Sequence, residues 1–360
     1  MEIGRKQITE LSRGCRIDFP KSTNPDYPLS VKSDEILFNG NMVRRKRIIL
    51  LTVGCGIGSC AMCPFPAESN INVTEENLIN QFKNSFVNSG DSLNNYDHIT
   101  LFCNGNFFSE REISKKAREY MFQEISKSKA SSVTIETLPQ FINEENIKRA
   151  KKILGNKTLQ VFMGLQSSNS FLRKYSINTT CSLKSFEKAV KLLLKHDFLP
   201  AAFVLIKPPF LTDLEAKTDV LNTMVYLDSV GVKNFTLCPM RVSRGTLLRK
   251  IYDSGFYSPL NLWVVVDILI EYSKFGLGLP MVNTTELKQH VNEDSVCAYS
   301  CEKCNSKIIE SIEEYLFSRD VKILEDLKCE CYKNAYKDTF HDVSIIDRIK
   351  KFYELENKKG

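Results

Sequence analysis

The sequence contains no apolar run long enough to cross a membrane. Its longest apolar stretches, such as residues 201–206, are far shorter than the roughly 20 residues that a spanning helix needs. The start of the chain carries charge with no apolar stretch behind it, which is not the pattern of a signal peptide. We therefore expect a cytoplasmic protein that does not contact a membrane.

A strong excess of one charge is also missing. The chain has 49 Lys and Arg residues against 43 Asp and Glu residues, for a net charge of +6. This mildly basic balance is compatible with nucleic acid, nucleotides or an anionic cofactor, and it does not choose among them. The densest basic cluster, residues 44–47, fits a solvated strand edge as well as a phosphate-binding site. No internal repeat and no separate RNA-binding domain stand out.

Cysteine, by contrast, is abundant, with 12 residues. In a reducing compartment, clustered cysteines indicate metal binding rather than disulfides. One group lies at residues 55–63 and a second at residues 297–331. The scattered thiols are interpreted as small buried hydrophobic residues; they are Cys15, Cys103, Cys181 and Cys238.

Short apolar runs alternate with segments of helical periodicity along most of the chain. The predicted strands are residues 48–53, 98–102, 132–135, 159–163, 203–206 and 235–237. The predicted helices are one that begins at Thr74 and residues 110–126, 143–154, 183–196 and 211–230. Such alternation predicts a parallel sheet. Six units predict an α/β fold with a partial (β/α)6 barrel, in which sites gather at the carboxyl ends of the strands.

Three parts of the chain are predicted. Residues 1–45 form an irregular lead-in, and residues 46–289 form the partial barrel, which ends with a helix at 260–275. Residues 290–360 are charged and cysteine-rich, with helical segments and no strand. We expect them to form a small C-terminal metal-binding module, because a segment of this size lacks core area and a metal cross-link would stabilise it.

The first cysteine group lies directly after the first predicted strand. Cys55, Cys60 and Cys63 fall within nine residues, and glycines between them let the backbone fold tightly around a bulky centre. Three thiolates leave one iron of a four-iron cluster open. An open iron can chelate the amino and carboxylate groups of S-adenosylmethionine. Structural zinc with a fourth ligand from elsewhere is the alternative, and the position after the first strand of a βα sheet argues against it.

The loop and the units after it resemble the radical S-adenosylmethionine (radical SAM) superfamily. The likeness is greatest to the radical-SAM subunit of archaeosine synthase, a relative of the elongator catalytic subunit. The likeness rests on the Cys55–Cys63 loop, residues 102–107, 135–141, 164–167 and 207–212, and the C-terminal cysteines. The spacing here is C-x4-C-x2-C, whereas C-x3-C-x2-C is commonest in the superfamily. The resemblance implies a [4Fe–4S] cluster that cleaves S-adenosylmethionine reductively, and a 5′-deoxyadenosyl radical that abstracts hydrogen from the substrate.

Polar residues follow the second and third predicted strands. By resemblance, the turn Asn104-Gly105-Asn106 lies near the methionine amino group, with the two amides as acceptors, although it also fits an ordinary βα turn. Glu136 ends the third strand. Its carboxylate is placed to bind the methionine ammonium or a cationic substrate, or else to cap the next helix.

Further cofactor contacts are implied farther along. Met62 is expected to pack on the adenine, and Gln166 and Ser167 to lie near the ribose and carboxylate. Arg173 pairs with that carboxylate or faces solvent. Lys207, at the exit of the fifth strand, is a weaker candidate for an anionic group of the substrate.

The second cysteine group holds two close pairs of thiols. Cys301 and Cys304 precede Cys329 and Cys331, which matches a four-thiolate site filled by zinc or by a fully ligated iron–sulfur cluster. Cys297 is a spare thiol or replaces one of the four; unligated thiols are the other alternative. Residues 297–304 have the commonest radical SAM spacing, yet no βα units follow them, so they lack the necessary context.

Three functions stay open at this point. The resemblance suggests a lysine-bearing deazaguanine in tRNA as substrate, as in archaeosine-type tRNA modification. A radical SAM enzyme that acts on a small molecule in a biosynthetic pathway is the second, and a non-catalytic, metal-stabilised binding protein is the third. The enzyme hypotheses imply a reductant protein, such as flavodoxin or ferredoxin, as a partner.

Overall fold

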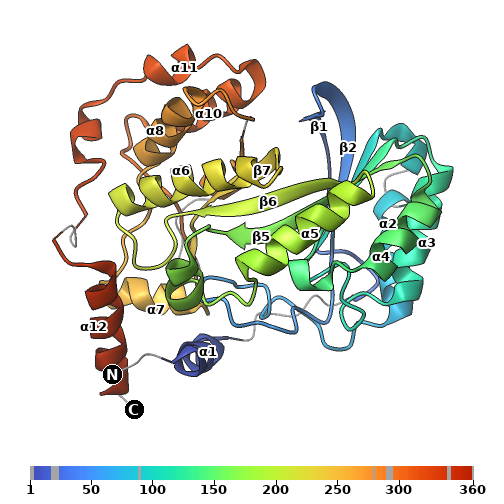
Figure 1. The fold of residues 1–360 in the computed structure, drawn as a ribbon, viewed down its shortest axis with the longest axis horizontal. Helices are drawn as coiled ribbons and strands as arrows, with labels where there is room; N and C mark the ends of the chain where they lie inside the picture. Colours follow the sequence, from blue (N-terminus) through green and yellow to red (C-terminus); the bar gives the residue numbers. More distant parts are fainter. Residues whose placement is uncertain are drawn as a thin grey trace.

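The computed structural model describes residues 4–17, 24–87, 91–278, 280–288, 295–338 and 342–358. Within this part of the chain, eight strands form one sheet in the order β1-β2-β3-β4-β5-β6-β7-β9 (Figure 1). The parallel strands are β2 (Asn41–Leu50), β3 (His98–Cys103), β4 (Ser132–Glu136), β5 (Thr158–Gln166), β6 (Leu199–Ile206), β7 (Asn234–Pro239) and β9 (Met281–Val282). The predicted α/β fold with a partial parallel barrel is confirmed.

Helices follow the strands and pack on the outer face of the sheet (Figure 1). They are α2 (Glu75–Val87), α3 (Lys115–Lys127), α4 (Glu144–Leu154), α5 (Leu183–Lys195) and α6 (Asp213–Ser229). Alternate strand residues, such as Val133 and Ile135 of β4, fill the layer between sheet and helices. They share a face because successive side chains of a strand point to opposite sides of the sheet. Side-chain caps fix several helix starts; Ser182 and Thr212, for example, form capping boxes at α5 and α6.

The predicted irregular lead-in is wrong in two places. Residues 5–14 form helix α1 (Arg5–Gly14), and β1 (Ser30–Phe38) pairs antiparallel with β2. The signal for this hairpin is Asn39-Gly40, whose φ angles of 48° and 81° suit a two-residue turn of the type that joins antiparallel strands. As a result β2 begins at Asn41 rather than at residue 48.

The C-terminal region divides between two places. Helices α10 (Asn305–Ser318) and α11 (Lys322–Glu325) pack with α8 (Leu262–Ser273) on the main core, while α12 (Ile345–Asn357) joins a second core with α1 and α7 (Leu247–Asp253). α9 (Thr285–Lys288) is a single turn after β9. The prediction that this region has no strand is wrong, because β10 (Ser295–Val296) pairs with β8 (Val242–Ser243). The predicted boundary at residues 289–290 lies outside the described residues, so the domain division stays a prediction.

The two ends of the described chain meet. Gln7 of α1 donates a hydrogen bond from Nε2 to Oδ1 of Asn357 in α12, at 2.7 Å, and the two helices lie close together in Figure 1. Among the helices described, none is long and apolar enough to span a membrane.

Candidate functional site

The first cysteine group lies in an irregular loop, residues 54–64, which follows β2 at the carboxyl edge of the sheet. We call it the first cysteine loop. Its Gly54 has a φ of 85°, and a Cβ there would lie 2.6 Å from Ser69 Cβ. Only glycine fits that position without moving its neighbour.

The three thiols of this loop are partly buried and act on one another. Burial, and then the nearby Cys55, raise the pKa of Cys60 to about 12. The pKa of Cys63 is raised still more, by burial first and then by Cys60. Thiols that interact electrostatically in this way would become thiolates on binding iron or zinc, because a metal deprotonates the thiols that bind it. The donor set therefore fits a metal centre.

Glu112 joins the first cysteine loop to the turn after β3. Its carboxylate accepts hydrogen bonds from the backbone N–H of Gly56, at 3.2 Å, and from both the backbone and the side-chain amide of Asn106. Burial raises the pKa of Glu112, and these bonds oppose that effect. A Cβ on Gly105 would overlap Glu112 Oε2, so any larger residue there would displace the Glu112 carboxylate. Glu112 was not among the predicted site residues because it fell inside the predicted helix 110–126, whereas the helix begins only at Lys115.

The amide oxygens predicted to meet the cofactor already have partners. Asn104 Oδ1 accepts from the backbone N–H and the hydroxyl of Thr52, at 3.0 and 2.8 Å. Asn106 Oδ1 accepts from the backbone N–H of Leu138 at 2.9 Å, and its Nδ2 lies 3.5 Å from Cys55 Sγ. Asn104 Nδ2 is buried and has no hydrogen-bond partner. Asn104 therefore has a donor, rather than an acceptor, to offer a ligand.

Glu136 is half-buried at the end of β4. Its Oε1 accepts a hydrogen bond from the backbone N–H of Cys103 at 2.8 Å. Burial raises the pKa of this carboxyl to about 8, although the hydrogen bond lowers it. The alternative that Glu136 caps the next helix is wrong, because Asn143 caps α4.

Gln166 ends β5 in a strained conformation beside a shift of strand register. Its φ is 73°, and its Oε1 is buried without a partner. Gly164 makes room for it, since a Cβ there would lie 2.7 Å from Gln166 Nε2. Backbone strain of this kind gathers at functional sites, and an orphaned buried acceptor fits a ligand.

The other predicted cofactor residues hold the protein itself together. Ser167 donates from Oγ to Asp219 Oδ1 at 2.7 Å. Arg173 is buried and donates to the carbonyls of Leu165, Ser167 and Cys181, so the alternative that it faces solvent is wrong. Met62 packs in the second core.

The inner face of the sheet carries a polar layer and then an aromatic layer toward the carboxyl edge. His98 contacts Thr134 Oγ1 at 2.9 Å in the polar layer, and burial lowers its pKa to about 3, which leaves it neutral. Phe102, Phe162 and Phe203 form the aromatic layer, with centroids of the last two 4.6 Å apart. These rings are half-buried, so the barrel interior offers apolar surface near Glu136.

The basic side chains of Lys207 and of the cluster at residues 44–47 form ion pairs with acidic residues of the same chain. Lys207 has no exposed surface and lies 2.9 Å from both Asp213 Oδ1 and Asp338 Oδ1, so it is not available to an anionic substrate. In the basic cluster of residues 44–47, Arg45 pairs with Asp34 at 2.6 Å and Lys46 with Asp91 at 2.9 Å. The cluster lies in β2, which pairs with β1 on one side and β3 on the other, so the predicted strand edge is wrong.

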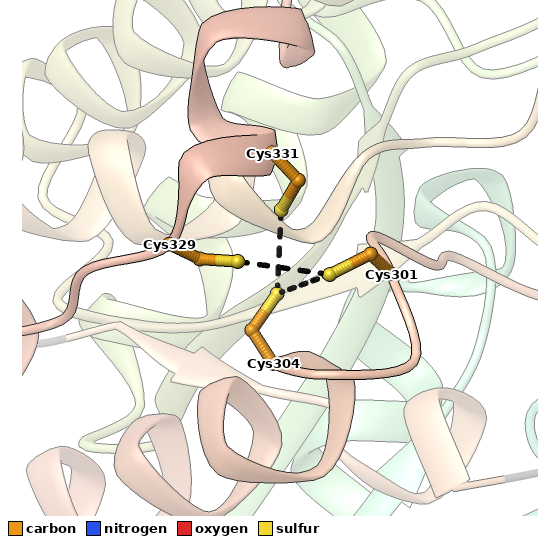
Figure 2. A group of neighbouring side chains, drawn as sticks. All are labelled: Cys301, Cys304, Cys329 and Cys331. Atoms are coloured by element: carbon orange, nitrogen blue, oxygen red, sulfur yellow. Dashed lines mark hydrogen bonds between the residues drawn. The ribbon is translucent and has the colours of Figure 1, made fainter.

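The second cysteine group forms one compact site (Figure 2). Its four thiol sulfurs lie within 4.8 Å of one another, from Cys301, Cys304, Cys329 and Cys331. The separations are 3.4 Å for Cys301–Cys304, 3.4 Å for Cys304–Cys331 and 3.7 Å for Cys301–Cys329. Hydrogen bonds with the neighbouring thiols, that with Cys304 first, lower the pKa of Cys301. Residues far apart in sequence thus make the four-thiolate geometry that the spacing predicts.

Trp263 of α8 supports this site from outside. Its indole Nε1 donates to Cys331 Sγ at 3.2 Å, the kind of outer contact that orients a metal ligand. Cys297 is buried and is not a member of the four-thiol group.

The partial parallel barrel, with a three-thiol loop after its first parallel strand, is the arrangement that the resemblance to radical SAM proteins implies. No protein-family model matches the chain. It is 28% identical, over 88% of each chain, to an uncharacterized protein of Methanocaldococcus jannaschii. It is 23% identical to the archaeosine synthase subunit beta of Methanosarcina acetivorans, over 91% of this chain and 93% of that protein. The resemblance predicted from the sequence is thereby confirmed over nearly the whole chain.

A solved structure of Methanocaldococcus infernus Elp3, lacking its N-terminal residues 1–46, is also similar. The TM-score is 0.48 at 15% identity, over 67% of this chain and 58% of that one.

Proposed function

We propose that this chain is a radical SAM enzyme whose [4Fe–4S] cluster is held by Cys55, Cys60 and Cys63. The single observation that carries the proposal is the three-thiol loop at the carboxyl edge of the sheet, the edge that also holds the buried, unpartnered polar atoms of Asn104 and Gln166. A bound cluster would supply one electron to S-adenosylmethionine and so generate a 5′-deoxyadenosyl radical.

The residues around the loop have separable roles in this proposal. Glu112 and Asn106 hold the loop against the turn after β3, and Asn106 Nδ2 also faces Cys55 Sγ. Glu136 and Gln166 offer oxygen acceptors to the amino-acid end and the ribose of S-adenosylmethionine. Met62, Ser167 and Arg173 act indirectly, because their side chains pack in the core or bond to this chain.

The substrate proposed is a modified deazaguanine base in tRNA. This rests on the relatives named archaeosine synthase subunit beta. The half-buried rings of Phe162 and Phe203 support it, since apolar ring faces suit a planar base. A small molecule is the alternative substrate. Retention of tRNA that weakens steeply as salt rises supports the first, and indifference to tRNA supports the second.

Zinc is the metal proposed for the second cysteine group. A tetrahedral Zn–S distance of about 2.3 Å places sulfurs about 3.8 Å apart. The separations of 3.4 to 3.7 Å are close to this value. A four-iron cluster binds each thiolate at a different iron and would hold the sulfurs farther apart, by the width of the cluster.

The test is anaerobic reconstitution with iron and sulfide, followed by an assay for 5′-deoxyadenosine with dithionite as reductant. The wild-type protein should bind about four irons at the first site and form 5′-deoxyadenosine. The triple change of Cys55, Cys60 and Cys63 to Ala should abolish both. Cys297→Ala, at a buried thiol outside the first cysteine loop, is the matched control and should retain both. A triple variant that still cleaves S-adenosylmethionine would contradict the site assignment, and an inactive, iron-free wild type would favour a binding protein.

A further inference from the structure

The N-terminal helix is attached to the first cysteine loop through Asn178. Its Nδ2 donates to the carbonyl of Ser59 at 2.8 Å and contacts Thr9 Oγ1 of α1 at 3.0 Å. Ser59 Oγ donates back to the carbonyl of Asn178 at 3.2 Å. Asn178 is fully buried, so one side chain joins α1, the loop and the segment after β5.

Apolar contacts reinforce this attachment. Ile8 of α1 is fully buried and packs in the second core with Ala61 and Met62, which lie between the cluster thiols Cys60 and Cys63. Arg5, at the start of α1, donates to the carbonyl of Thr179. The residues that follow α1 are consequently directed along the first cysteine loop.

Arg16 lies against this loop. Its guanidinium occupies the space where a side chain at Gly58 would begin, since a Cβ there would lie 2.6 Å from Arg16 Nη2 and 3.3 Å from its Cζ. The next residue, Ile17, packs in the same way on Gly245, where a Cβ would lie 2.8 Å from Ile17 Cγ1. Gly58 stands between Cys55 and Cys60, so the cation is placed among the thiols.

The electrostatic interactions of Arg16 agree with this position. Burial and then Arg13 lower the pKa of Arg16, while Cys63, Cys55 and Cys60 all raise it. Arg16 therefore interacts electrostatically with all three thiols of the first cysteine loop. Three thiolates around an iron–sulfur core leave a net negative charge that grows when an electron is added, and a half-buried cation is screened less than an exposed one.

We infer that Arg16 is a positioning residue for the cluster, which covers the first cysteine loop and stabilises the reduced cluster by its positive charge. This inference rests on the proposed function. It makes the N-terminal segment part of the redox site, although that segment is far from the cysteines in sequence.

The test is the midpoint potential of the reconstituted cluster, followed by electron paramagnetic resonance during a dithionite titration without S-adenosylmethionine. Arg16→Gln should lower the ratio of reduced to oxidised cluster at a fixed potential by roughly tenfold, which is 59 mV for a one-electron couple. Arg16→Lys, which keeps the charge, should stay near the wild type. Arg13→Gln is the matched control, because it removes the same charge from an exposed position three residues earlier.

The outcomes separate the inference from the proposed function. If the wild type binds no cluster, the proposed function fails. If the wild type binds a cluster and Arg16→Gln matches Arg13→Gln in potential, the inference on Arg16 is overturned while the proposed function stands. Should Arg16→Gln fail to load iron, loading of Arg16→Lys supports the role of the charge, and failure of both variants overturns it.

Discussion

The ammonium of Lys207 lies 2.9 Å from the carboxylate of Asp338, 131 residues later in the chain, and both side chains are buried. Asp338 also accepts from Ser258 Oγ at 2.6 Å and from the backbone N–H of Asp213 at 2.5 Å. The carboxyl edge of β6, the start of α6 and the C-terminal segment are therefore joined by one buried ionic network.

Breaking this network should destabilise the fold. Asp338→Asn removes one of the two carboxylates that pair with buried Lys207 and leaves Asp213, so the cost should stay below the roughly 3–5 kcal/mol typical of leaving a buried charge with no partner. Thermal unfolding of the protein checks this, with Asp320→Asn, on the exposed turn before α11, as the control. Equal melting temperatures for the two variants would show that Asp338 contributes nothing specific.

The second prediction concerns the four thiols near the C-terminus. Changing Cys329 and Cys331 to Ser should remove one metal ion and lower the melting temperature, because binding energy at a structural site is also folding energy. Metal analysis of the purified protein should find zinc in the wild type. Cys297→Ala is the control, and it should keep the metal since Cys297 lies outside the four-thiol group. Loss of metal on that change would make Cys297 a ligand.

The third prediction concerns Gly105. An alanine there would overlap Glu112 Oε2 and separate Glu112 from the backbone of Gly56. Iron loading of the first cysteine loop should therefore fall several-fold in Gly105→Ala, measured as iron per chain after reconstitution. Gly14→Ala meets nothing within 4 Å and should load normally. Normal loading of both variants would remove Glu112 from the support of the loop.

The regular part of the fold was predictable because strands and helices have different periods. Each apolar run of the barrel became a parallel strand, and the predicted helices 183–196 and 211–230 match α5 and α6 to within two residues at each end. The β1–β2 hairpin was missed although Asn39-Gly40 signals it. The polar run before it hid the pattern, because β1 is an exposed edge strand with no alternation to detect.

Site residues could be predicted only where the metal-binding residues lie close together in the sequence. The two cysteine groups follow from short motifs, whereas the partners of Lys207 and Arg16 depend on contacts between distant segments. Side-chain direction is equally invisible in a sequence. Asn104 and Asn106 stand where the motif places them, yet their oxygens turn toward this chain's own backbone.

The last prediction concerns Glu136, whose carboxyl has a folded-state pKa of about 8 against an ordinary value of 4.5. Between these values the folded protein holds a proton that the unfolded chain releases, so stability falls as pH rises, by up to about 1.4 kcal/mol per pH unit. Glu136→Gln cannot titrate, and its melting temperature should lose this dependence between pH 5 and about 8 in the cofactor-free protein.

If the carboxylate also meets the methionine ammonium, the same change should weaken S-adenosylmethionine binding roughly ten- to a hundredfold, the equivalent of one charge-assisted hydrogen bond. One titration of S-adenosylmethionine onto the reconstituted protein and one turnover assay distinguish the roles, because a substrate-binding Glu136 leaves cofactor affinity intact while turnover falls. Unchanged affinity and turnover, with the pH effect present, would limit Glu136 to its hydrogen bond with Cys103.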